Sequence, residues 1–152
     1  LGGLPAAPPL NLLALFARPA DEFLTDPLTA RAAVLLFDQV PRNLYRGTAE
    51  AFAFDPLARH VCHGVLARGW DRGLSRAERQ FLGLPLEHSE HIADQLASLR
   101  YFMALGDAGT YAFALSHYRM IARFGRFPHR NAALGRTSTP AEIAAVEAGN
   151  HW

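Results

Sequence analysis

The chain has 152 residues, half of them apolar and 19% charged, which is enough to build the core of one domain. All fifteen basic residues are arginine and fourteen acids oppose them, so a strongly basic surface for nucleic acid or anionic lipid is excluded. The lack of lysine rules out Schiff-base chemistry, and the single Cys62 rules out an internal disulfide or a zinc site of several cysteines.

No apolar stretch is long enough to be a membrane span, which needs about 20 residues. The longest near the start, residues 10–17, is short and contains Asn11. No basic segment precedes it, as one would in a secretory signal. These features predict a cytoplasmic protein with no membrane partner.

The first half of the chain is predicted to begin irregularly and then become helical. Residues 1–20 are rich in proline and glycine and form a lead-in with one helical turn at residues 11–16. Residues 21–152 are predicted to form a single helical domain. Within it, residues 27–39 are almost continuously apolar, which predicts a buried central helix that Pro41 stops or kinks.

The next helices are marked by their capping residues. Asp55 before Pro56 is the N-cap of a helix that Gly69 closes. A capping box at residues 75–78 opens a short helix that ends near Gly83.

The second half of the chain is predicted to hold the two longest helices. Pro85 starts one at residues 86–105, and Asp107 caps another that runs to Phe124. A second capping box, at residues 139–142, opens a last short helix. No segment alternates with period two, so the predicted fold class is all-α, with short loops that favour antiparallel helical hairpins.

Polar residues fall where the helical pattern places the core. On residues 86–105, His88 and Gln95 lie within an apolar stripe, and His117 lies within the stripe of the following helix; the first stripe consists of Ile92, Leu96, Leu99, Phe102 and Met103. A buried imidazole or amide without a partner costs on the order of 1–3 kcal/mol, so these groups are predicted to be hydrogen-bonded. They either hold helices together or border a cavity.

Two further polar segments, residues 38–47 and 123–131, each join arginine, asparagine and proline at a helix end. We expect them to converge on a pocket for a carboxylate, a phosphate or a peptide terminus, with Asp38 and Glu87 offsetting part of the positive charge. The candidate ligand-binding residues are Asp38, Arg42, Asn43, Arg46, His88, Gln95, Arg126, His129, Arg130 and Asn131.

Two other functions stay open at this point. In a metal-free acid–base enzyme, His88 or His129 would be the general base, oriented by Glu87 or Asp38. In a scaffold, the same residues would serve only to hold helices together for contact with a partner protein.

A metal enzyme is a weaker alternative. Glu87, His88, His91 and Asp94 span two helical turns, but no His-Glu-x-x-His motif is present, so no metal or other cofactor is predicted.

Four strings between about Leu24 and Glu147 resemble, in order, a bacterial family of unknown function, domain-of-unknown-function family 924. They are DQVPRN at residues 38–43, RGT to DP at 46–56, PLEHSE at 85–90 and FGRFPHRN at 124–131. The resemblance implies an all-α, tetratricopeptide-like right-handed superhelix and no assigned activity.

Overall fold

The structure, a computed structural model, describes residues 12–152, and every regular element in that range is helical. The prediction of an all-α fold is therefore confirmed. The α-helices are α1 (Leu12–Phe16), α2 (Pro27–Leu44), α3 (Asp55–Ala67), α4 (Arg76–Glu87), α5 (Ile92–Leu105), α6 (Ala108–Phe124) and α7 (Pro140–Glu147). Three 3-10 turns join them: η1 (Ala20–Phe23), η2 (Ala49–Phe52) and η3 (Pro128–Arg130). The helical turn predicted in the lead-in is α1, and residues 1–11 lie outside the described range.

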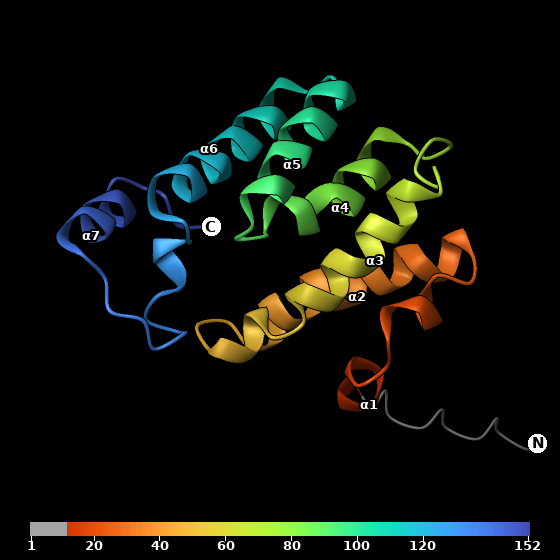
Figure 1. Cartoon of the computed structure of the whole chain (residues 1–152), viewed down its shortest axis with the longest axis horizontal. Helices are drawn as coiled ribbons and strands as arrows, with labels where there is room; N and C mark the ends of the chain where they lie inside the picture. The colour runs from red at the N-terminus through yellow and green to blue at the C-terminus, as the bar shows by residue number, and fades with distance from the viewer. Residues whose placement is uncertain (1–11) are drawn as a thin grey trace, which may run out of the picture.

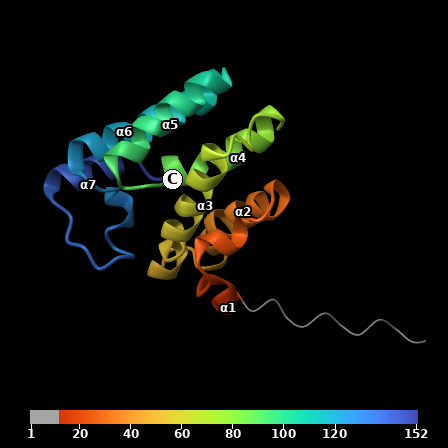
Figure 2. The same ribbon diagram turned by 45° about the vertical axis from the view of Figure 1, so that its right-hand side comes forward.

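Consecutive helices pack as hairpins, α2 with α3, α4 with α5 and α5 with α6, which confirms the predicted pairing of the last two. Figure 1 shows α2 and α3 together at the bottom, α5 and α6 together at the top and α4 between them. Because the chain reverses at each loop, the C-terminal ends of α2, α4 and α6 share one side of the molecule with the N-terminal ends of α3 and α5. Figure 2 shows the same side after a turn of 45°.

The largest apolar core lies between α2, α3 and α4, around the fully buried Phe37, Val61 and Leu86. Cys62 belongs to this core, and its Sγ donates to the Leu82 carbonyl at 3.1 Å. Burial raises the pKa of the thiol far above its usual range. Among the described helices, none has the length and apolar character needed to cross a membrane.

The close approach of α4 to α5 depends on a glycine. A Cβ at Gly83 would lie 2.6 Å from Tyr101 Cε1 and 3.0 Å from Phe102 Cζ. The predicted helix end near Gly83 is wrong, because α4 passes through this glycine and uses its small surface for packing.

Two prolines lie inside helices. Pro41, predicted to stop or kink its helix, does not stop it, and Pro85, predicted to start a helix, lies within one. Helix α2 continues through Pro41 to Leu44, and α4 continues through Pro85 to Glu87. Each proline lies near the C-terminal end of its helix. A proline lacks the N–H that would bond to the carbonyl four residues earlier, and its ring crowds that carbonyl, so it costs one hydrogen bond and a local distortion. Near the end of a helix, only a short stretch follows that distortion.

The prediction of one helix over residues 86–105 is wrong, because the chain breaks between Glu87 and Ile92. Ser89 Oγ accepts from the His91 amide at 3.1 Å and donates to Asp94 at 2.7 Å. Gln95 Nε2 donates to the carbonyls of Glu87 at 2.6 Å and Ser89 at 2.7 Å. Such side-chain bonds to nearby backbone compete with helix continuation, and here they hold the break.

The inward face of α5 also differs from the predicted apolar stripe. Ile92, Leu96 and Met103 are 47%, 41% and 63% exposed, and the buried set is Asp94, Gln95, Ser98, Phe102 and Leu105. The polar residues face inward because they have partners there. Asp94 contacts Arg59 and His63 of α3, and Gln95 donates to the end of α4. In α6, Phe113 is exposed while His117 and Met120 are buried.

The helix caps follow the sequence closely, with one exception. Both capping boxes form, at Ser75 and at Thr139, and Gly125 ends α6 with a φ of 70°. Asp55 is the exception: Phe54 is the N-cap of α3, and Asp55 is its first residue. The Asp55 carboxylate is thereby free to serve in the site described next.

Candidate functional site

A cavity of about 500 Å³ lies beside the C-terminal ends of α2, α4 and α6. Three arginines and four histidines contribute to its wall, together with two aromatic rings and three small residues. They are Arg42, Arg46, Gly47, Ala51, Phe52, His88, His117, His129, Arg130, Ala133, His151 and Trp152. A second cavity of about 250 Å³ adjoins it and shares Phe52, His88 and Arg130.

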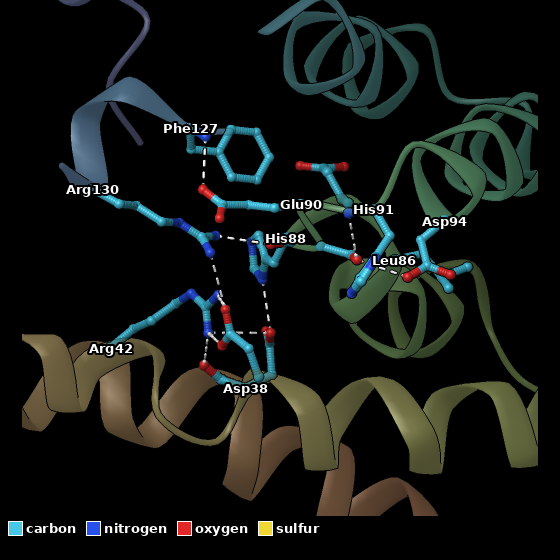
Figure 3. A network of polar contacts seen from close by, with 12 residues as sticks. Asp38, Arg42, Leu86, His88, Glu90, His91, Asp94, Phe127 and Arg130 are labelled. Carbon is cyan, nitrogen blue, oxygen red and sulfur yellow. Dashed lines mark hydrogen bonds and ion pairs between the residues drawn. The ribbon is translucent and has the colours of Figure 1, made fainter. Parts of the chain in front are cut away.

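Two of the arginines meet at one carboxylate. Arg42 donates to Asp55 from Nη1 at 2.7 Å and from Nη2 at 2.9 Å, a bidentate pair. Arg130 donates to the same carboxylate from Nη1 at 3.1 Å and to the His88 carbonyl from Nη2 at 2.9 Å. Figure 3 shows the two guanidinium groups facing each other across the network. The predicted convergence of the two arginine-rich segments is present in these contacts.

Arg130 is almost fully buried, with its guanidinium carbon 4.5 Å from the Phe52 ring centroid and 4.6 Å from that of Phe127. Burial lowers its pKa to about 10, against the opposing effect of Asp55. The side chain therefore stays charged at neutral pH. Its Nε has no hydrogen-bond partner among the described residues.

The turn that carries Arg130 is tied to the break between α4 and α5. Glu90 accepts from the Phe127 amide at 2.7 Å and pairs with Arg136 through both of its oxygens. These contacts fix η3 against the end of α4 (Figure 3).

His88 belongs to the same polar network and contacts Asp38. Its Nδ1 lies 2.7 Å from Asp38 Oδ1. Burial acts to raise the pKa of Asp38, but His88 and then Arg42 outweigh it and lower the pKa to about 2. Burial lowers the pKa of His88 itself. With Nδ1 on a carboxylate, the Nε2 lone pair of a neutral ring is available to accept a proton or to bind a metal ion.

Two more imidazoles face the cavity as neutral rings. Burial lowers the pKa of His117 to about 3 and that of His129 to about 4. His117 stacks on Trp152 with ring centroids 3.9 Å apart. Behind them, burial and then Asp38 raise the pKa of Glu87 to about 8. Glu87 is 4% exposed and lies 3.4 Å from His117 Nδ1.

The structure brings together five of the predicted ligand-binding residues at the cavity wall: Arg42, Arg46, His88, His129 and Arg130. Asp38 lies directly behind His88. The general-base candidates His88 and His129 therefore share the cavity, and Glu87 contacts His117 instead of orienting either of them.

The remaining candidates lie elsewhere for identifiable reasons. Arg126 pairs with Glu142 of α7. Asn131 is buried, and its side-chain amide donates a hydrogen bond to Ser138 Oγ. Asn43 is exposed and bonds back to the Gln39 carbonyl, while Gln95 is buried in the helix break. His91 is exposed and Asp94 bonds Arg59, so the alternative metal cluster of Glu87, His88, His91 and Asp94 does not form.

Asp55, Phe52, His117 and Trp152 were not among the predicted site residues. Asp55 was assigned to helix capping, a role that the same residue type performs in many loops. His117 did stand out as a polar residue in an apolar stripe, and that signal pointed correctly to an interior position. Nothing in the sequence signals that Phe52 or Trp152 would meet the arginines and histidines.

Comparisons with known proteins agree with the fold. The profile of a bacterial protein family of unknown function, DUF924, matches residues 11–150. A solved structure of a protein of unknown function from Agrobacterium tumefaciens is similar, with a TM-score of 0.84 and 39% sequence identity over 91% of this chain and 78% of that one. A search of curated proteins gave no match.

Proposed function

The chain belongs to the bacterial DUF924 family of proteins of unknown function, and we propose that it binds a small anionic ligand, a carboxylate or a phosphate, in the cavity at the ends of α2, α4 and α6. One observation carries the proposal: Arg42, Arg46 and Arg130 gather around a single cavity of about 500 Å³. Small-molecule sites span roughly 300–1,000 Å³, so the volume suits a compact ligand or the end of a peptide.

The charges in the wall favour an anion. The three guanidinium groups are opposed by the carboxylates of Asp38 and Asp55. Arg46 is exposed and has no ion-pair partner within residues 12–152, so its charge is uncompensated. Guanidinium groups bind carboxylates and phosphates through paired hydrogen bonds, which makes Arg46 the natural first contact for such a ligand.

The rest of the wall is preorganised. Asp55 fixes Arg42 and Arg130, and the rings of Phe52 and Phe127 hold Arg130 from two sides. A site whose donors are already oriented loses less conformational entropy on binding.

The proposal includes a tetratricopeptide-like superhelical arrangement of the helices, with the cavity on its concave side.

The test is thermal unfolding of the protein, first passed over a chelating resin, in graded phosphate, citrate and nucleotides. A ligand at a hundred times its dissociation constant should stabilise the fold by about 2.7 kcal/mol. General salt effects also stabilise proteins, but they grow steadily with salt concentration and do not depend on one side chain. The expected result is a shift that begins near the dissociation constant, rises with the logarithm of the ligand concentration, and is abolished in Arg46→Ala.

Arg100→Ala is the matched control, since Arg100 is exposed on α5 and does not line the cavity. The control should keep the full shift. If no anion gives such a shift, or if the shift survives in Arg46→Ala, the arginine cavity is not an anion site and the scaffold alternative is favoured.

A further inference from the structure

Three potential metal ligands meet beside the cavity: His88 and His117 line it, and Glu87 lies buried behind them. Glu87 and His88 lie at the C-terminal end of α4, and His117 lies in the middle of α6. One donor atom from each residue lies within 4.8 Å of those of the other two. Two of the three residues are buried and His88 is mostly so, so the cluster is not a surface accumulation of charge.

Each imidazole makes its hydrogen bond through Nδ1, which leaves Nε2 for a metal ion. His88 Nδ1 lies 2.7 Å from the Asp38 carboxylate, and His117 Nδ1 donates to the Phe113 carbonyl at 2.8 Å. Metal-binding histidines almost always donate their second ring nitrogen to a carboxylate or a backbone carbonyl, which fixes the tautomer and the ring orientation. Both hydrogen bonds leave Nε2 as the available ligand.

The third residue lacks a cationic partner. Glu87 Oε2 is buried and has no hydrogen bond within the described part of the chain, and no arginine pairs with this carboxylate. A buried carboxylate is costly unless a cation or hydrogen bonds compensate it. The C-terminal end of α4, where Glu87 lies, also carries the negative end of the helix dipole, which favours a cation.

We infer that Glu87, His88 and His117 bind one divalent transition-metal ion of the zinc type, with an open coordination position toward the cavity. Two imidazoles and one carboxylate form the donor set of many metal sites that keep a position for water or substrate. The only cysteine, Cys62, bonds to Leu82, so thiolate ligation is not involved. This inference replaces the expectation from sequence that the chain binds no metal.

The metal site does not depend on the proposed anion function, although the two would work together. His88 and His117 line the same cavity as Arg46. An anion bound by Arg46 could therefore place an oxygen in the open position of the metal.

The test is titration of chelator-treated full-length protein with Zn²⁺ against a chromophoric competitor in a non-coordinating buffer. One equivalent should bind saturably, and Co²⁺ at the same site should give visible d–d absorption. Glu87→Gln should weaken binding by at least about 10-fold and remove the Co²⁺ bands. This variant keeps the size of the side chain, and the altered Oε2 makes no hydrogen bond that could be lost.

His117→Gln is a second variant with the same expected loss, and His60→Gln is the control because His60 is an exposed imidazole on α3. Absence of one saturable equivalent, unchanged binding in Glu87→Gln, or loss of binding in His60→Gln would each overturn the assignment. Arg46→Ala should keep metal binding, whereas Glu87→Gln should keep an anion shift measured on metal-free protein. The two proposals can therefore fail separately.

Discussion

Arg130 Nη1 donates to Asp55 Oδ2 at 3.1 Å, although 75 positions separate the two residues in the chain. Through this contact the turn after α6 is joined to the first residue of α3. Arg42 donates to the same carboxylate from the end of α2. A single acidic side chain thus fixes two arginines from two segments, and the shape of the cavity depends on it.

Replacement of Asp55 should therefore be costly. Asp55→Asn removes the charge that two guanidinium groups share, and we expect a loss of about 1.5–3 kcal/mol in the free energy of unfolding, as for hydrogen bonds to charged groups. Equilibrium unfolding in urea measures it. Glu147→Gln, an exposed acid on α7, is the control and should stay within about 0.5 kcal/mol of the parent. A loss in Asp55→Asn no larger than in the control would mean that the arginines are held by other contacts.

Gln95 should matter for the break between α4 and α5. Its Nε2 donates to the carbonyls of Glu87 and Ser89, and Gln95→Ala leaves both without this donor in a buried setting. The expected destabilisation is about 1–3 kcal/mol, measured by thermal or urea unfolding. Gln80→Ala on α4, where the side chain has no hydrogen bond among the described residues, should change stability far less. Equal effects in the two variants would contradict a capping role for Gln95.

The helical fold was predictable because its signals are local. Capping boxes, glycine after a helix and the lack of period-two alternation act within a few residues, and each of the caps at Ser75, Thr139 and Asp107 forms as the sequence indicates. The break after Glu87 was not predictable in this way. It depends on Gln95 and Asp94 reaching partners that only the folded chain supplies.

Part of the site was predictable, because one of its contacts is also local in the sequence. The pairing of Asp38 with Arg42 follows from their spacing on one helix, four residues apart. The contacts of Asp55 with Arg130 and of Glu90 with Arg136 join distant segments, and nothing in the spacing of those residues marks them as partners. Arg126 lies in the same segment as Arg130, yet it pairs with Glu142 of α7 and does not line the cavity.

The contact of α4 with α5 offers a test that is independent of polar groups. Gly83→Ala would place a Cβ 2.6 Å from a Tyr101 ring atom, so α4 or the ring must shift. We expect a destabilisation of about 1–3 kcal/mol, typical of overpacking, in spite of the better helix propensity of alanine. Calorimetry or urea unfolding measures it. At Gly73 a Cβ would meet nothing within 4 Å, so Gly73→Ala is the matched control and should be tolerated.

Acid should weaken the docking of α7. The hydrogen bond from Arg126, followed by the cap contact with the Thr139 amide, lowers the pKa of Glu142 from 4.5 to about 2. A carboxyl with a depressed pKa in the folded state stabilises the protein above its unfolded value, and this contribution is lost as the pH falls from 4.5 toward about 2. The difference in melting temperature between the parent and Glu142→Gln should therefore shrink across that interval. A difference that stays constant with pH would show that the ionised form of Glu142 contributes nothing specific.

Because Cys62 is buried, modification of its thiol can report on local opening of the folded protein. The thiol lies in the core between α3 and α4 with its Sγ on the Leu82 carbonyl, and its raised pKa leaves almost no thiolate in the folded state. A thiol reagent can modify it only when that interface separates, so the labelling rate counts opening events without any introduced probe. Because the chain has no other cysteine, one mass increment per molecule follows the process to completion.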